Sequence, residues 1–338
     1  MKRILPFLPF LFPFLASPAA AQESAAAPKK PDPPQHTFLW KVERKDMATN
    51  YLFGTIHVPD DRIHALHADV KAALDQADAL IGELDLTDTK EMEEKVMAAG
   101  MLPEGQSLKS LLPADLYQDL DDLVTPYGLR AALLDRFQPF MVALTLAQLE
   151  VLNDIAAGKK ALDMRLFMVA NHKGIQVGGV ETVDEQVEAL AHTLTLEESI
   201  VSLRKTVDQL KDAKERGVGE LERIMMAWLS GSERYLLALA LESWNPEDPL
   251  DKRTREALLL NRNRNMAARS AKMMREHPAT KHVFAFGTFH FLGEGSVVEL
   301  LRKDWFTVTR LLAPTAKEEQ AVMDADRWLK QPAKVGGQ

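Results

Sequence analysis

The same four-residue pattern, Gly-Thr-x-His, occurs twice in this 338-residue sequence, each time at the end of a short apolar run. The first copy is "GTIH" at 54–57 and the second is "GTFH" at 287–290. In each copy the apolar run predicts a β-strand, and the residues after the histidine predict a loop followed by a helix. A chain that repeats this arrangement is predicted to have an α/β fold whose sheet is at least partly parallel.

The first copy belongs to a β-loop-α-β unit. Residues 51–53 predict a strand, residues 63–77 have apolar positions at helical spacing, and residues 79–86 predict a second strand that includes Glu83. Because such crossovers connect parallel strands, both strands end at the same edge of the sheet. We therefore expect His57 and Glu83 to reach that edge, where open α/β sheets bind their ligands.

The second copy starts an equivalent unit, which contains His290 in its loop. The pattern predicts a strand at 283–286, a helix at about 296–303 and a strand at 306–311. A further strand is expected within 173–182, and Glu181 stands at its carboxyl end. We therefore expect His57, Glu83, Glu181 and His290 to meet along one edge of the central sheet.

The glycine of each copy is part of this prediction. A strand that enters a tight turn needs a residue that tolerates unusual backbone angles and lets backbone or ligand come close, so we expect Gly54 and Gly287 to belong to the site. The neighbouring threonine can fix the loop through a local hydrogen bond. In the alternative interpretation Gly-Thr only ends a strand and the histidines are bystanders. Two copies in matching settings favour the functional interpretation.

The N-terminus predicts export. A basic start, a short proline-broken apolar stretch and an Ala-x-Ala site are typical of a secretory signal peptide and too short for a membrane span. We therefore expect a periplasmic or secreted protein. The expected organisation is a signal peptide at 1–21, a proline-rich flexible leader at 22–36, an α/β domain at 37–313 with a helical insertion at about 100–260, and a polar tail at 314–338.

Charge and composition narrow the classes of partner. The formal net charge is −8, and removal of the two positive charges in residues 1–21 makes it −10. An acidic chain without a basic stripe is a poor candidate for binding nucleic acid or an anionic membrane surface. The absence of cysteine excludes disulfides and a lipid-modified N-terminal cysteine. We therefore expect a peptide or small-molecule substrate, and no transmembrane segment.

Two helical stretches add to this picture. Residues 196–229 predict a helical hairpin, which serves either as a lid over the crevice or as the surface of a homodimer. Residues 251–277 predict a long amphipathic helix with Arg262 on its apolar face. A buried arginine needs an anionic partner, so Arg262 holds a carboxylate of the site, stabilises an oxyanion, or makes a core-to-surface salt bridge. Spacing alone does not choose between Arg262 and Arg264.

The expected cluster has the chemistry of a metal site. Two neutral imidazoles with one or two carboxylates are the ligand types of a catalytic transition-metal centre that keeps an open position for water. A metal there would lower the pKa of its water and polarise a carbonyl. The sequence contains no cysteine, no recognisable serine nucleophile motif and no HExxH, so metal-activated water is the simplest hydrolytic route. A metal-free polar cluster that binds a ligand is the alternative.

As a set, these motifs resemble the TraB/GumN family, which is similar to the Tiki metalloproteases and more distantly to erythromycin esterase and ChaN-like proteins. The resemblance covers about Phe38 to Leu312. It rests on the stretches "LFGTIHVP", "IGELDL", "ALDMRLFMVANHKGIQVGGVET", "RNRNMA" and "FGTFHFLGEGSVVELL". It implies an α/β fold with a helical middle segment and, for the Tiki branch, metal-dependent hydrolysis of peptides. One departure is Gly82, where the family more often has a β-branched residue before the glutamate.

The resemblance also bears on single residues. Its R-N-x-x-M-A pattern falls on Arg262 and Asn263, and therefore favours Arg262 over Arg264. We expect a divalent metal (Mn, Co or Zn) bound by His57, His290 and Glu83, with Glu83 and Arg262 as catalytic residues.

Three classes of function follow. The first is an exported metal-dependent hydrolase, with the peptidase-like substrate class that the resemblance to the Tiki branch implies. The second is a protein that sequesters a peptide or small signal, and the third is a haem or metal carrier. A haem carrier needs an axial ligand and an apolar slot but no carboxylate–arginine pair. The combination of His57, Glu83 and Arg262 therefore favours catalysis.

Overall fold

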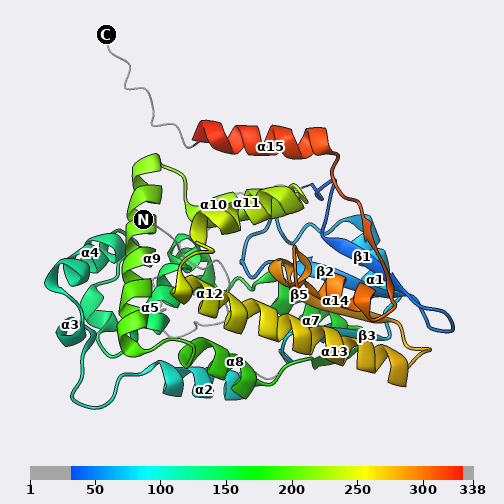
Figure 1. The fold of residues 1–338 in the computed structure, drawn as a ribbon, viewed down its shortest axis with the longest axis horizontal. Helices are drawn as coiled ribbons and strands as arrows, with labels where there is room; N and C mark the ends of the chain where they lie inside the picture. Colours follow the sequence, from blue (N-terminus) through cyan, green and yellow to red (C-terminus); the bar gives the residue numbers. More distant parts are fainter. Residues whose placement is uncertain (1–31, 88, 330–338) are drawn as a thin grey trace, which may run out of the picture.

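The computed structural model describes residues 32–87 and 89–329, so the predicted signal peptide and most of the predicted leader lie outside the described residues. The described chain has a mixed α/β fold, in which a six-stranded sheet lies beside a large group of helices (Figure 1). The strands are β1 (Leu39–Glu43), β2 (Asn50–Thr55), β3 (Ala79–Gly82), β4 (Gln176–Gly179), β5 (His282–Gly287) and β6 (Thr307–Leu311).

The helices occupy most of the rest of the described chain. Before β4 they are α1 (Ala68–Asp75), α2 (Lys90–Gly100), α3 (Leu108–Leu111), α4 (Ala114–Val124), η1 (Thr125–Tyr127), η2 (Ala131–Leu134), α5 (Pro139–Leu146), η3 (Leu149–Val151), α6 (Leu152–Ala156) and α7 (Leu162–His172). After β4 they are α8 (Val183–Ala191), α9 (Leu196–Arg216), α10 (Glu220–Leu229), α11 (Glu233–Ser243), α12 (Pro249–Arg255), η4 (Glu256–Leu260), α13 (Asn261–Glu276), η5 (Thr288–Phe291), α14 (Val297–Lys303) and α15 (Ala316–Leu329).

The strand order β4-β3-β5-β2-β1-β6 explains how distant parts of the sequence meet. Strands β4, β3, β5 and β2 are parallel neighbours, whereas β1 pairs antiparallel with both β2 and β6. The late strand β5 therefore lies between β2 and β3, the two strands of the first Gly-Thr-x-His unit. Parallel pairing brings the carboxyl ends of β2, β5 and β3 to one edge, as the sequence predicts.

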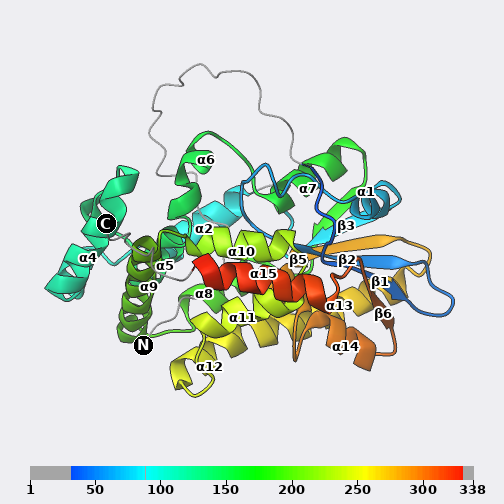
Figure 2. The ribbon, with the colours of Figure 1, turned by 90° about the horizontal axis from the view of Figure 1, so that it is seen from above.

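Two apolar cores support this arrangement. The first packs the sheet against α1, α7, α10, α11, α13 and α14. The second lies among α2, α3, α4, α5 and α9, and its buried residues come from between Leu84 and Val207. Figure 2 shows the sheet and α14 at one end of the molecule and α4 and α9 at the other. The pocket described below is lined by residues of both cores.

The predicted helical hairpin at 196–229 is present as α9 and α10. The chain turns between them at Gly217, whose φ of 71° is favourable only for glycine. The helix predicted at 251–277 is present as three consecutive segments, α12, the π-helical turn η4, and α13. In the described residues no single helix has the length and apolarity of a membrane span, although the bent pair of helices at 139–146 and 149–156 reaches those values together.

Two predicted elements in the first unit are too long. The strand predicted at 79–86 ends at Gly82. A side-chain carbon on Gly82 would lie 2.8 Å from the ring of Phe167 and from the backbone oxygen of Leu84. This close contact also explains the glycine that departs from the family pattern. The helix predicted at 63–77 begins at Ala68, where the side chain of His67 caps its first turn.

The folded part of the chain extends past its predicted end at 313. Helix α15 lies along α10 and α11 (Figure 1), and Arg223 of α10 donates hydrogen bonds of 2.7 and 3.0 Å to the carboxylate of Asp326. Arg223 is 1% exposed and also pairs with Glu220 and Glu242. Many of the polar residues at 316–327 thus belong to a helix that a buried ion pair anchors to α10.

Asp326→Asn should lower the free energy of unfolding by about 1–3 kcal/mol, because it removes the charge from a buried, charge-assisted pair of hydrogen bonds. Asp324→Asn is the matched control, since Asp324 pairs with Arg327 on the solvent side of the same helix. We expect the control to change stability by less than about 0.5 kcal/mol. Urea denaturation measures both, and equal effects would contradict the proposed anchor.

Candidate functional site

The two Gly-Thr-x-His loops lie side by side and are hydrogen-bonded to each other. The hydroxyl of Thr288, directly after β5, donates to the backbone oxygen of Thr55 at the end of β2, over 2.8 Å. The indole N–H of Trp228, from α10, is 3.0 Å from both the backbone oxygen of Gly54 and the hydroxyl oxygen of Thr288. These contacts fix the relative position of the two loops.

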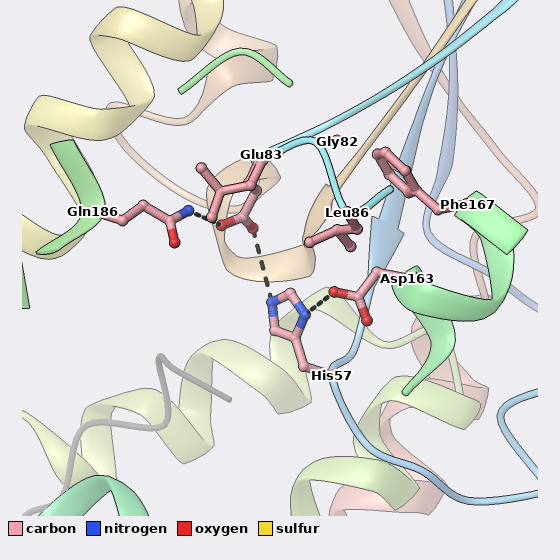
Figure 3. A pocket seen from close by; sticks show the side chains of 9 residues that line it. His57, Gly82, Glu83, Leu86, Asp163, Phe167 and Gln186 are labelled. Atoms are coloured by element: carbon pink, nitrogen blue, oxygen red, sulfur yellow. Dashed lines mark hydrogen bonds and ion pairs between the residues drawn. The ribbon is translucent and has the colours of Figure 1, made fainter. Parts of the chain in front are cut away.

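The histidines of the two loops converge on one carboxylate. Nε2 of His57 lies 3.8 Å from Oε1 of Glu83, and Nε2 of His290 lies 3.7 Å from the same oxygen. Glu83 follows the end of β3, so the three groups come from three parallel strands of the sheet. All three side chains are largely buried. Figure 3 shows His57 directed at Glu83.

The second ring nitrogen of each imidazole, Nδ1, is hydrogen-bonded to a buried side chain. Nδ1 of His57 is 2.5 Å from Oδ2 of Asp163, in the first turn of α7. Nδ1 of His290 is 2.6 Å from Oδ1 of Asn263, whose amide nitrogen in turn donates to the backbone oxygen of Gly295. Both partners are acceptors, so in the neutral form of each imidazole Nδ1 carries the proton and the Nε2 lone pair faces Glu83. This is the arrangement that orients histidine ligands in metal sites.

Arg262 joins two carboxylates at the ends of adjacent strands. Its Nη2 is 2.6 Å from Oε2 of Glu83 and 2.6 Å from Oε2 of Glu181, and its Nε lies 3.0 Å from Oε1 of Glu181. Arg262 is 6% exposed, as expected for an arginine on the apolar face of its helix. Because its guanidinium holds these carboxylates, it is a positioning residue. Of the three roles considered for Arg262 from the sequence, these contacts match the holding of a site carboxylate.

The ionisation of the site follows from burial and these neighbours. Burial alone would raise the pKa of Glu83, but Arg262 and the two histidines hold this pKa far below its usual range. Burial lowers the pKa of His290 to about 3, so its imidazole is neutral. Burial would also lower the pKa of His57, but the charge and hydrogen bond of Asp163 raise it above the usual value.

The two glycines have different roles, and neither depends on an unusual backbone angle as the sequence suggested. Gly287 has an ordinary φ of −50°. A side-chain carbon on Gly287 would lie 3.1 Å from Oε1 of Glu83 and 3.2 Å from Nε2 of His57, in the space where the three groups converge. A carbon on Gly54 would lie 2.8 Å from Phe38 and from Thr288, inside the core. Close approach is the reason for glycine at both positions.

The site's residues suit a metal ion in type. For ligand bonds of about 2.1 Å, neighbouring ligand atoms in a tetrahedral site are about 3.4 Å apart. The two nitrogen–oxygen separations here are 3.7 and 3.8 Å, which a shift of a few tenths of an ångström would close. Across residues 32–87 and 89–329, no three His, Cys, Asp or Glu side chains form a ready-made metal-binding group. The fit therefore rests on donor type, on orientation and on the absence of a side chain at Gly287, beside which the three groups converge.

Comparison with known proteins identifies the family. A model of the TraB/PrgY/gumN family matches residues 38–310, which is most of the chain. The chain belongs to the TraB/PrgY/gumN family. This result confirms the resemblance inferred from the sequence motifs.

Curated relatives in the family are named metalloproteases. Metalloprotease TIKI2 of Danio rerio is 30% identical over 315 residues, which cover 81% of this chain and 60% of the relative. A Metalloprotease TIKI homolog of Nematostella vectensis is 28% identical over 318 residues, which cover 81% of this chain and 66% of the relative. Metalloprotease TIKI1 of Homo sapiens is 28% identical over 336 residues, which cover 87% of this chain and 66% of the relative. The chain thus spans about 60–66% of the length of these relatives. No solved structure matches the chain.

A small pocket adjoins the site in this family member. Its polar side is formed by Glu83, His57, Asp163 and Gln186 (Figure 3). The rest of its wall is apolar or small and consists of Gly82, Leu84, Leu86, Phe167 and Ala285. The pocket lies between the sheet, α7 and α8, where the two apolar cores meet.

Sequence reasoning missed two residues of this site, Asp163 and Gln186. The amide of Gln186 donates to Oε2 of Glu181 at 3.1 Å and to Oε2 of Glu83 at 3.4 Å. Asp163 could have been found, because it shares a helix face with Leu166 and Phe167. A carboxylate on an apolar helix face is buried, and it then needs a partner.

The glycines give a test that separates site from fold. Gly287→Ala should weaken binding of a divalent metal at least about tenfold, because its methyl group enters the space between His57 and Glu83. The free energy of unfolding of this variant should change by less than about 1 kcal/mol. Gly54→Ala should lower that free energy by about 1–3 kcal/mol through overpacking of the core. Urea denaturation and metal titration measure the two effects, and the reverse ranking would refute this assignment.

Proposed function

We propose that this protein is a metal-dependent hydrolase that acts on peptides, with a divalent cation bound by His57, His290 and Glu83. The observation that supports it best is the convergence of two imidazole Nε2 atoms on one carboxylate oxygen, above a glycine that leaves room for an ion. The metalloprotease names of the relatives support the same reaction class.

Electrostatics also favours a cation at this place. With neutral imidazoles, the cluster contains three carboxylates, from Glu83, Glu181 and Asp163, and one guanidinium, from Arg262. Its formal charge is therefore −2 in a largely buried environment. Uncompensated buried charge is costly, and a divalent cation would neutralise it. Two imidazoles and one carboxylate are a common ligand set for catalytic zinc and related metals.

Each side chain has a defined task in this proposal. When bound, the cation supplies a Lewis acid that polarises a peptide carbonyl and activates water. Asp163 and Asn263 accept hydrogen bonds from Nδ1 of the two histidines, so that in the neutral imidazoles the Nε2 lone pairs are available to the cation. Arg262 and the backbone N–H of Gly287 keep Glu83 ionised and immobile. Glu83 is thereby suited to be a ligand and is a poor proton acceptor.

We also propose that the protein acts outside the cytoplasm, in the periplasm or the extracellular medium. The support is the sequence of residues 1–21, which has the basic start, apolar stretch and Ala-x-Ala site of a signal peptide. Cell fractionation of the full chain, with N-terminal sequencing of the mature protein, tests this localisation.

The wild-type protein should bind Mn, Co or Zn at about one ion per chain, and His57→Ala or His290→Ala should each weaken binding at least about 100-fold by removing a ligand. His67→Ala is the matched control, because His67 only caps α1. Elemental analysis and isothermal titration at about pH 8, where imidazole is neutral, measure the binding. Failure of the wild type to bind any of these metals would exclude the proposed centre.

Glu83→Gln should reduce peptide cleavage at least about 100-fold, because it removes the charge of a ligand, and should preserve the fold, because Glu181 still pairs with Arg262. Glu185→Gln is the control, since Glu185 pairs with Arg269 outside the cluster, and its activity should stay within about twofold of wild type. The assay is mass spectrometry of a mixed peptide pool with added Mn, Co or Zn. Undiminished cleavage by Glu83→Gln would contradict the mechanism.

A further inference from the structure

Asp163 is a buried carboxylate whose presence the fold alone does not explain. It is 4% exposed and comes from α7, 106 residues after His57, yet its Oδ2 contacts Nδ1 of that histidine at 2.5 Å. Its other oxygen, Oδ1, is buried without a hydrogen-bond partner among the described residues. A buried carboxylate oxygen without a partner costs stability, so Asp163 is an unfavourable residue for this position unless it has another role.

The other histidine of the site provides the comparison. Nδ1 of His290 contacts the amide oxygen of Asn263 at 2.6 Å, and the amide nitrogen of Asn263 donates to the backbone oxygen of Gly295. Asn263 is fully buried, and both ends of its amide are satisfied. A neutral amide therefore meets the requirement for an acceptor behind an imidazole, without an unsatisfied charge. The carboxylate behind His57 does more than accept a hydrogen bond.

We propose, on the basis of the proposed metal site, that Asp163 is a positioning residue that fixes the Nδ1–H tautomer of His57, directs its Nε2 at Glu83 and strengthens the bond of this nitrogen to the cation. A carboxylate behind a histidine ligand raises the basicity of the ligand, whereas an amide mainly orients the ring. The two histidines are thus unequal ligands. His57 is the stronger donor of the pair, and Asp163 provides that strength.

A purely structural role predicts different behaviour. Asp163 lies in the first turn of α7, where a negative charge stabilises the helix. If this were its role, replacement would lower stability and leave His57 and the affinity for metal unchanged. In our proposal the tautomer and the affinity change, whereas the stability of the metal-free protein is nearly unaffected.

The experiment compares the full-length wild type with Asp163→Ala and Asp163→Asn. In metal-free protein at about pH 9, where imidazole is neutral, long-range proton–nitrogen NMR reports which ring nitrogen of His57 carries the proton. The wild type should have the Nδ1–H form, and Asp163→Ala should shift toward the Nε2–H form. Titration with Zn or Mn should give an affinity about 10–100-fold lower for Asp163→Ala. Asp163→Asn keeps an acceptor and the size of the side chain, and its loss should be smaller.

Asp326→Asn is the matched control, because it changes another buried carboxylate far from the cluster, at the α15 anchor. It should lower the melting temperature and leave the NMR signals of His57 and the metal affinity unchanged. An unchanged tautomer in Asp163→Ala, or a metal affinity within about threefold of wild type in both Asp163 variants, would overturn the proposal. If the wild type bound no metal, the proposed function would fail, and the NMR result alone would decide whether Asp163 orients His57.

Discussion

The ion pairs of Arg262 are the interaction on which the rest of the site depends. One guanidinium from α13 holds Glu83 after β3 and Glu181 after β4, and so ties a long helix to the ends of two neighbouring strands. Without Arg262, two carboxylates would lie close together in a buried space and repel each other. The positive charge of Arg262 lowers the free-energy cost of burying the Glu83 carboxylate beside two histidines. It contacts Oε2 of Glu83, so Oε1 remains directed at the histidines.

The sequence predicted the residues that belong to a repeated pattern and to strand ends. His57, His290 and Glu83 could be predicted because each follows a short apolar run, and the parallel direction of such strands brings their ends together. Arg262 could be predicted from helical periodicity, since a charge on the apolar face of a helix requires a partner. The helical middle segment could be predicted from the same periodicity, and its turn could be predicted from Gly217, which interrupts the helical pattern.

Other features depend on contacts between elements that periodicity does not describe. Asp163 meets His57 only because α7 packs on the sheet beside β3, and this packing is set by side-chain shapes in the first core. The requirement for Gly54 arises from Phe38 and Thr288, which approach it across the sheet. The partner of Asp326 is more than a hundred residues away in the sequence, so the polar residues after 313 gave no sign of the buried contact that holds α15.

The place of β5 in the sheet has a consequence for the order of events during synthesis. This strand is encoded near the end of the described chain, yet it separates β2 from β3 in the finished sheet. A ribosome that has produced β2, β3 and the helical middle segment has produced two strands with no direct pairing between them. The contacts that span this gap are long-range in sequence, and such contacts form late in folding. The proposed site therefore lacks His290 and the strand that places it beside His57 and Glu83 until synthesis has passed the second Gly-Thr-x-His loop.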